Sequence, residues 1–395
     1  IEGQASTMQI DTATRRSLEL THGTNGGKTG SLLGAIDRTV TAGGARLFER
    51  QLSSPSCRLS VITQRQDSVE YFVKNPRLAQ DLRDALRGVH DLDRALSRLA
   101  LERGGPRDMA AIRNTIAQAS ILRDALPDDM PEAMLAASVA LSGHNDLLKL
   151  LDHALIAEPP LLARDGGFVA PKYDTSLDEA RKLRDDGRSI IAAMQTDFIE
   201  LSGVSALKIK HNNVLGYFIE TTATHADKML AAPLNETFIH RQTTANQVRF
   251  TTVELSEIET RILNAGGRTL DIEKQIYQIL TQAIINQSGS LGTLARGLAE
   301  FDVATALAHF ATMENWCKPI IDDSQAFNIA GGRHPVVEQA LQKSGTPFIA
   351  NDCELSKMRI WLLTGPNMAG KSTFLRQNAL IGIMAQMGSF VPCLL

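Results

Sequence analysis

Apolar residues recur at three- and four-residue spacing through most of the chain before residue 360, which is the pattern of amphipathic helices. A first helix is expected over residues 31–51, where the apolar positions approximate one stripe. Prolines and glycines separate five further helical stretches, at residues 59–73, 77–87, 92–101, 108–126 and 132–141. The pattern therefore predicts a helical bundle with short connections.

Three longer helical patterns follow. Residues 177–201 are charged, with apolar residues on one face, which is typical of an extended helix. Residues 253–285 and 291–313 show two more long helical patterns. We find no convincing fixed-period repeat and no low-complexity tract in the sequence.

Between the long helices the period changes. Residues 206–210 and 214–222 alternate as two strands around a hairpin turn at His211, Asn212 and Asn213. Residues 204–265 hold six Lys or Arg and six Asp or Glu, so this β-rich unit is not basic overall. Its cations are nevertheless segregated from its acids, which gather at the start of the following helix.

Polar side chains of this β unit are candidates for contact with DNA. Lys208 and Lys210 lie at the hairpin, and Arg241, Gln242 and Arg249 belong to a second polar group. Such side chains suit phosphate oxygens of a duplex irrespective of base sequence. The alternative is a small solvated domain with ordinary surface charge, and spacing alone does not decide between the two.

The most specific motif lies near the C-terminal end and fits the phosphate-binding P-loop G-x-x-x-x-G-K-[ST] at every fixed position. It runs through Gly365, Pro366, Asn367, Met368, Ala369, Gly370, Lys371 and Ser372. Residues 358–364 predict a strand buried on both faces, and apolar spacing from residue 374 predicts a helix. This strand, loop and helix context is the one that a P-loop requires.

The residues of the motif have distinct expected roles. The glycines let backbone N–H groups turn toward a phosphate at a helix N-terminus. Lys371 is expected to reach the β- and γ-phosphates of ATP as the catalytic cation, Ser372 to ligate Mg²⁺, and Thr373 to assist at a phosphate oxygen. The motif therefore predicts binding of a nucleoside triphosphate.

Composition adds limits rather than a function. With 395 residues the chain is expected to hold two or three domains, and its net charge of −3 favours neither DNA binding nor its absence. The four cysteines form no metal-binding spacing and suggest reduced thiols. No bilayer-length apolar run and no signal pattern occur in the sequence, so a cytoplasmic location without a membrane is expected.

The chain begins with Ile1 and ends shortly after the predicted P-loop helix. A P-loop ATPase also needs further strands, including one that supplies an acidic residue for Mg²⁺. We therefore expect a piece of a longer protein that hydrolyses ATP, with hydrolysis by this piece alone uncertain.

Several motifs in order resemble the MutS family of DNA mismatch-repair ATPases, within the ABC-type ATPase class. The resemblance rests on residues 364–377 around the P-loop, 332–338 and 347–352 before it, 216–220 and 241–243 in the β unit, and 6–20 and 30–33 near the start. It covers essentially the whole chain.

The resemblance implies a multidomain fold: a mostly α-helical core and lever arms, an inserted small β-rich clamp, and the beginning of an α/β P-loop ATPase domain. The implied divisions are residues 1–12 (end of a connector and start of the core), 13–203 (core and first lever), 204–265 (clamp), 266–318 (returning lever and core) and 319–395 (start of the ATPase domain). The implied function is a DNA-dependent ATPase that clamps mismatched double-stranded DNA, with ATP and Mg as cofactors. Implied partners of the full-length protein are a second copy of itself and downstream mismatch-repair proteins.

The resemblance also implies residues that spacing does not show. Phe348 matches the aromatic that stacks on adenine, whereas by composition it would be a core residue. Asn212, with Arg241, Gln242 and Arg249, matches the DNA clamp.

Three alternatives remain open at this stage. One is a family relative that acts on branched or recombining DNA, and another is a small-molecule kinase with the same loop, against which the long helical arms argue. The third is a DNA-binding scaffold without ATPase activity.

Overall fold

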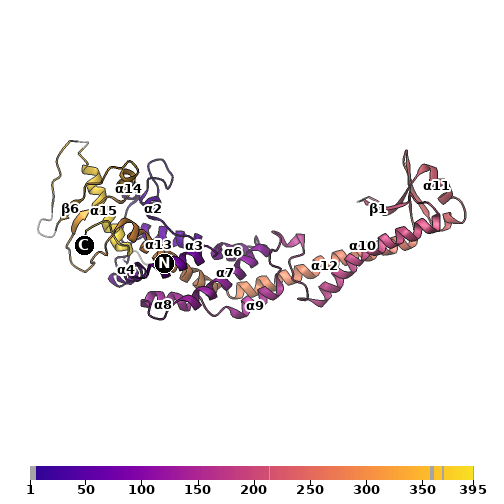
Figure 1. The fold of residues 1–395 in the computed structure, drawn as a ribbon, viewed down its shortest axis with the longest axis horizontal. Helices are drawn as coiled ribbons and strands as arrows, with labels where there is room; N and C mark the ends of the chain where they lie inside the picture. Colours follow the sequence, from indigo (N-terminus) through magenta and orange to yellow (C-terminus); the bar gives the residue numbers. More distant parts are fainter. Residues whose placement is uncertain (1–5, 213, 356–359, 367–368, 395) are drawn as a thin grey trace. The chain divides into compact units, whose positions relative to one another are not determined.

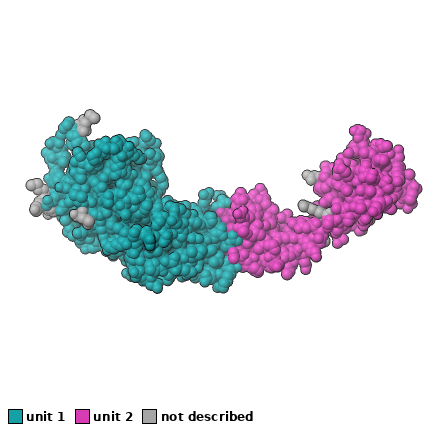
Figure 2. Space-filling view, viewed as in Figure 1, with its two compact units in different colours: residues 1–104, 111–149, 284–395 teal, residues 105–110, 150–283 magenta. Residues whose placement is uncertain are grey.

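The computed structural model describes residues 6–212, 214–355, 360–366 and 369–394, and divides them between two compact units. Unit 1 comprises residues 1–104, 111–149 and 284–395, and unit 2 comprises residues 105–110 and 150–283 (Figure 2). Figure 1 shows the order of the elements along the chain. None of the helices in the described parts combines the length and apolar character needed to cross a bilayer.

The helices before the β unit are α1 (Thr12–Ser17), α2 (Leu32–Ile36), α3 (Ala42–Ser53), α4 (Leu59–Lys74), α5 (Pro76–Leu86), α6 (Leu92–Ala100), α7 (Pro106–Ala125), α8 (Glu132–Val139), α9 (Asn145–Ala154) and α10 (Thr175–Ser202). The β unit contains β1 (Lys208–Asn212), β2 (Gly216–Thr222), α11 (Ala223–Leu230), β3 (Ile239–Thr243) and β4 (Gln247–Thr251). After it come α12 (Val253–Asn286), α13 (Ser288–Glu314), β5 (Asn328–Gly332), α14 (Pro335–Lys343), β6 (Asn351–Glu354) and α15 (Lys371–Met387).

Helix α13 forms the centre of unit 1. It buries fifteen residues and packs against α3, α4, α5, α6 and α8. A helix that is apolar on nearly all sides belongs in the middle of a bundle, because no face of it is suited to water. The bundle predicted from the sequence is confirmed.

The single helix predicted over residues 31–51 is wrong, because the chain forms α2 and α3 with a break between them. The Asp37 carboxylate accepts hydrogen bonds from the backbone N–H and the hydroxyl of Thr39, at 2.9 and 2.7 Å. Buried Asp302 on α13 accepts from the N–H groups of Val40 and Thr41. These side chains offer the backbone an alternative to helical hydrogen bonds, which ends α2 and starts α3 anew.

Unit 2 contains a four-stranded antiparallel sheet in the order β1-β2-β4-β3. One face of the sheet packs on an apolar cluster that includes Phe198 of α10, Met229 of α11 and Leu255 of α12. Ile219, Val248 and Phe250 point from the sheet into this cluster. The hairpin predicted from the sequence is confirmed, with the strands beginning two residues later than expected.

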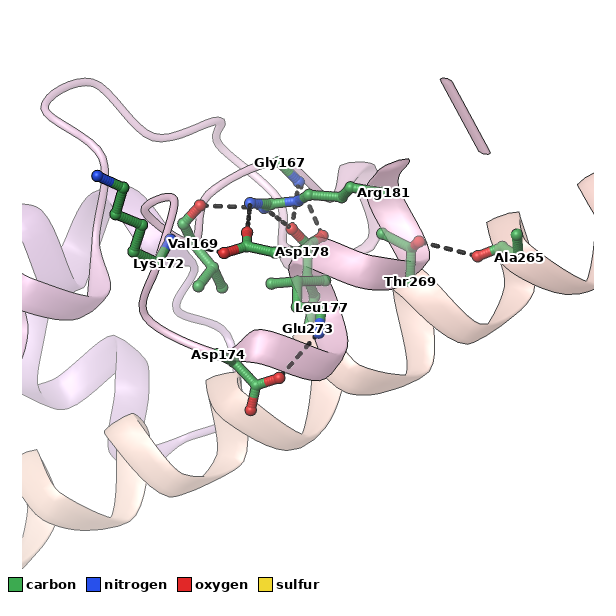
Figure 3. A network of polar contacts seen from close by, with 10 residues as sticks. All are labelled: Gly167, Val169, Lys172, Asp174, Leu177, Asp178, Arg181, Ala265, Thr269 and Glu273. Carbon is green, nitrogen blue, oxygen red and sulfur yellow. Dashed lines mark hydrogen bonds and ion pairs between the residues drawn. The ribbon is translucent and has the colours of Figure 1, made fainter. Parts of the chain in front are cut away.

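Helices α10 and α12 approach each other closely within unit 2. A Cβ atom on Gly187 of α10 would lie 2.4 Å from Ile262 of α12, so only glycine allows this spacing. A buried ion pair joins the same two helices: Arg181 donates to Glu273 at 2.6 Å, and the Glu273 carboxylate also accepts from the N–H of Gly167 (Figure 3).

The strand predicted at residues 358–364 is wrong for its described part, residues 360–364. Ile360 and Leu362 are 86% and 88% exposed, whereas the prediction placed them in a core. A strand buried on both faces needs hydrogen-bonded neighbours and a cover on each side, and the described residues bring neither to this segment. Trp361 instead stacks on Phe374 of α15, with ring centroids 6.4 Å apart.

Candidate nucleic acid and nucleotide sites

The open face of the sheet in unit 2 carries most of the predicted DNA-binding side chains. Directly paired residues share a face, and the pairs Lys208–Glu220, Glu220–Arg249 and Arg249–Gln242 run across all four strands. Lys210 lies two residues from Lys208 and therefore on the same face. We call this set the sheet face: Lys208, Lys210, Glu220, Gln242 and Arg249.

Glu220 organises the sheet face. Its side chain is 6% exposed and lies between two cations, with Lys210 at 2.6 Å and Arg249 at 3.3 Å. Burial raises the pKa of Glu220, but the hydrogen bonds and charges of Lys210 and Arg249 outweigh that effect and lower the pKa overall. The carboxylate is therefore ionised and cancels one of the two positive charges.

Arg249 is held in place by further contacts. It donates to the Gln242 side-chain carbonyl at 2.8 Å, and its guanidinium lies 4.7 Å from the ring centroid of Phe218. Stacking on an aromatic ring and a paired carboxylate orient the planar guanidinium. Sequence reasoning missed the role of Glu220, although an acid inside a strand opposite cations is a recognisable signal.

The other two predicted DNA-binding residues have different settings. Arg241 is exposed and lies at the register shift between His240 and Gln242, which is a β-bulge. The Asn212 side-chain carbonyl accepts from the N–H groups of Val214 and Leu215, at 2.9 and 2.7 Å, and so shapes the hairpin turn. The NH₂ group of the Asn212 side chain is the part that could donate a hydrogen bond to DNA.

The predicted nucleotide site lies in unit 1, at the start of α15. Gly370 is the N-cap residue, with φ of 80°, and makes no side-chain capping hydrogen bond to the first turn. The Lys371 ammonium donates to the Gly365 carbonyl, and the N–H of Ala369 donates to the Pro366 carbonyl at 3.1 Å. Asn367 and Met368 lie outside the described residues.

The N–H groups of the first turn and a nearby ammonium fit an anion, because both supply positive charge at the helix N-terminus. Ser372 is exposed and Thr373 is half-buried, so both hydroxyls lie near the surface. Phe348 is half-buried in the segment between α14 and β6, which is neither helix nor strand. The residues present thus fit a phosphate group.

A cavity of about 110 Å³ adjoins the first turn of α15. Its lining includes Glu19, His334, Thr373 and Arg376. Arg376 pairs with Glu19 at 3.6 Å, which connects the P-loop helix to the segment after α1. Of these side chains, sequence reasoning assigned a role only to Thr373, at a phosphate oxygen.

His334 is buried beside this cavity and caps α14. Its Nδ1 accepts from the N–H of Val337 at 3.4 Å. Burial, and next the positive charge of Arg376, lower the pKa of His334 to about 4. The imidazole is therefore neutral near pH 7.

The fold and the sites define a mostly helical protein of two units, with a polar antiparallel sheet in one and a P-loop sequence in the other. The family model for MutS domain III matches residues 13–308, and the model for MutS domain V matches residues 361–395. The chain belongs to the MutS family.

Similar curated proteins carry the name DNA mismatch repair protein MutS. The protein from Dinoroseobacter shibae is 64% identical over 388 residues, which are 98% of this chain and 44% of the relative. Those from Ruegeria pomeroyi and Paracoccus denitrificans are 62% and 61% identical, each over 99% of this chain and 45% of the relative. The chain thus spans less than half the length of these relatives.

Proposed function

We propose that this chain is the core, lever, clamp and initial ATPase region of a mismatch-repair ATPase. The observation that carries the proposal is the sheet face, in a chain whose family relatives are named for DNA mismatch repair. On this reading residues 13–203 and 266–318 are the helical core and levers, residues 204–265 the clamp, and residues 319–395 the start of the ATPase domain. Residues 1–12 join the core to a preceding domain.

The sheet face and Arg241 hold the backbone of duplex DNA. Lys208 and Arg241 supply charge that no carboxylate in the described residues cancels, and they contact phosphate oxygens directly. Lys210 and Arg249 keep one net positive charge with Glu220, and their fixed geometry sets the register of the contact. Gln242 and the amide of Asn212 donate further hydrogen bonds.

The loop at residues 365–373 binds ATP with Mg²⁺. The N–H groups at the start of α15 and the Lys371 ammonium hold the phosphates, Ser372 ligates the metal, and Phe348 stacks on the adenine. ATP, when bound, supplies a phosphoanhydride bond whose hydrolysis drives a change in the clamp. In the full-length protein, a cytoplasmic dimer that also engages other repair proteins, ATP binding and DNA binding bias each other.

The test titrates this chain with a fluorescent ATP analogue and Mg²⁺, with and without duplex DNA. Lys371→Ala is expected to weaken nucleotide binding at least tenfold and to leave DNA binding unchanged. The double variant Lys208→Ala/Arg241→Ala is expected to weaken duplex binding about tenfold at low salt and to reduce the salt slope by about 2. Lys149→Ala, an exposed cation of unit 1, is the matched control.

Each failure has a separate meaning. Duplex binding without any nucleotide response would replace the ATPase reading with a DNA-binding scaffold, which the exposed segment 360–364 favours for this chain alone. Tighter binding to a four-way junction than to a mismatched duplex would favour a relative that acts on branched DNA. If Lys371→Ala still bound the nucleotide normally and Lys208→Ala/Arg241→Ala still bound the duplex normally, both proposed sites would be wrong.

A further inference from the structure

Two cysteines from distant parts of the chain meet in unit 1. Cys317 follows α13, and Cys393 lies in the segment after α15. Backbone hydrogen bonds pair Cys317 with Val391 in both directions, at 3.0 and 2.9 Å. On its other side the segment is held by bonds from Leu394 N–H to the Ala330 carbonyl and from Arg333 N–H to the Pro392 carbonyl, each 2.9 Å.

The two cysteines lie close together. The Cys317 Sγ lies 3.6 Å from the carbonyl oxygen of Leu394, which directly follows Cys393. Cys393 is 8% exposed, whereas Cys317 is half-buried and reachable from solvent. The contact with Cys393, with a smaller contribution from the Arg333 charge, lowers the pKa of Cys317.

We propose that Cys317 and Cys393 are an oxidation site at which a peroxide forms an intrachain disulfide. Cys317 is the attacking thiol, because it is the more accessible of the two and lies two residues after Asn315, whose carbonyl accepts from the Arg333 guanidinium at 2.9 Å. Cys393 is the resolving thiol, because the backbone already holds it beside Cys317. This assignment does not depend on the proposed function.

The chemistry balances with hydrogen peroxide as the oxidant. The Cys317 thiolate attacks one peroxide oxygen, an S–O bond forms, the O–O bond breaks, and the leaving hydroxide takes up a proton to become water. The Cys393 sulfur then attacks the sulfenic sulfur, the S–S bond forms, the S–O bond breaks, and a second water leaves. Two thiols and one peroxide thus give one disulfide and two waters.

The disulfide would fasten the segment after the P-loop helix to the segment after α13. The backbone bridge between Cys317 and Val391, two residues before Cys393, keeps the two cysteines in neighbouring segments, as a disulfide requires. The other two cysteines provide a comparison within the same chain, since Cys57 is exposed and Cys353 is buried. Exposure alone would make Cys57 the first thiol to react.

The test oxidises the unmodified chain with about one equivalent of hydrogen peroxide, quenches in acid and alkylates the remaining thiols. Peptide mapping without reductant is expected to give a linked pair containing Cys317 and Cys393, with a mass loss of about 2 Da that dithiothreitol reverses. Cys57 and Cys353 should be recovered as alkylated thiols, because they are not oxidised. Oxidation at Cys57 while Cys317 and Cys393 stay alkylated would overturn the proposal, as would a linkage between two molecules.

A pair of variants separates the two steps. In Cys393→Ser, the Cys317 sulfenic acid is expected to persist and to be trapped by dimedone, whereas Cys57→Ser should leave the disulfide yield unchanged. The principal measurement uses the unmodified chain. If no Cys317–Cys393 disulfide forms there, the proposal is wrong, even if Cys393→Ser fails to fold.

Discussion

At the scale of single residues, Glu220 controls the charge of the sheet face. The carboxylate neutralises one of the two cations it contacts and fixes both in place. Its removal has two opposite consequences, because the face gains positive charge while Lys210 and Arg249 lose their common anchor. For a contact made with phosphates, the gain in charge dominates at low salt.

Glu220→Gln is therefore expected to tighten duplex binding several-fold at low salt and to steepen the salt dependence by about one phosphate equivalent. Fluorescence anisotropy with a labelled duplex over a series of salt concentrations measures both quantities. Glu236→Gln removes the same charge from an exposed position outside the sheet face and should change little. An unchanged salt slope in Glu220→Gln would mean that this face does not meet the phosphates.

His334 makes the stability of unit 1 depend on pH. Its pKa is lowered to about 4 from an ordinary 6.5, so between these values the unfolded chain binds the proton and the folded chain does not. The free energy of unfolding therefore rises with pH between about 4 and 6.5. The stability that neutral His334 contributes is fully present above this window and is lost as pH falls through it. Buried His144 and half-buried His309, whose pKa values desolvation also lowers, act in the same direction.

His334→Asn is expected to remove up to about 3 kcal/mol of the stability difference between pH 7.5 and pH 4. Asparagine keeps an acceptor that can cap α14, so the effect reports the lost titration rather than a lost cap. Urea unfolding followed by tryptophan fluorescence measures it, because both tryptophans, Trp316 and Trp361, belong to unit 1. His225→Asn, at an exposed position, should keep the pH dependence of the unmodified chain.

At the scale of elements, the pair of Arg181 and Glu273 fixes α10 against α12. Glu273 is 1% exposed and satisfies Arg181 and the N–H of Gly167 together, while Arg181 also donates to the Val169 carbonyl. A buried charge that loses its partner keeps its desolvation cost without compensation. The pair is therefore costly to break from either side.

Glu273→Gln is expected to destabilise unit 2 by about 3 kcal/mol, the low end for a broken buried pair, since glutamine can still accept a hydrogen bond. Hydrogen exchange of peptides from α10 and α12 measures the change, and the tryptophan transition of unit 1 should not move. Asp178→Asn is the matched control, because Asp178 lies 3.9 Å from Arg181 and is 38% exposed. Equal effects of the two substitutions would contradict the assignment.

Elements with a strong local pattern were predictable from the sequence. The long apolar stripes gave α10, α12 and α13, and alternation gave the hairpin of β1 and β2. The break between α2 and α3 was not predictable, because it depends on Asp302, which lies more than 250 residues along the chain from Thr41. Propensity describes neighbours in sequence and is overridden by such a distant acceptor.

The candidate sites divide in the same way. Apolar spacing after the motif predicted α15, and clustering of polar side chains predicted four members of the sheet face: Lys208, Lys210, Gln242 and Arg249. Pairing across strands decides which cations have their charge balanced by a neighbouring carboxylate. The roles of Lys210 and Arg249 therefore became clear only from the position of Glu220 between them. The turn made by Asn212 depends on the hairpin geometry as well.

At the scale of the whole molecule, the exposed segment 360–364 concerns the relation of this chain to its longer relatives. Ile360 and Leu362 expose apolar side chains immediately before the predicted P-loop, a motif that normally follows a buried strand. Burial of such side chains is worth about 1.5–3 kcal/mol each, which is enough to order a strand once neighbours are present. The D. shibae relative, of which this chain covers 44%, has additional sequence that can supply those neighbours.

We therefore expect the amides of residues 360–364 to exchange within seconds in this chain and at least a hundredfold more slowly in the D. shibae relative. An ordered strand places the P-loop in advance, so the nucleotide should bind the relative at least tenfold more tightly, because less ordering accompanies binding. Hydrogen exchange with mass spectrometry and the titration with the ATP analogue measure the two effects on matched samples. If the two proteins exchange these amides equally fast but differ in nucleotide affinity, the difference comes from contacts to the nucleotide that this chain lacks. If both the exchange and the affinity are equal, nucleotide binding does not require an ordered strand before the loop.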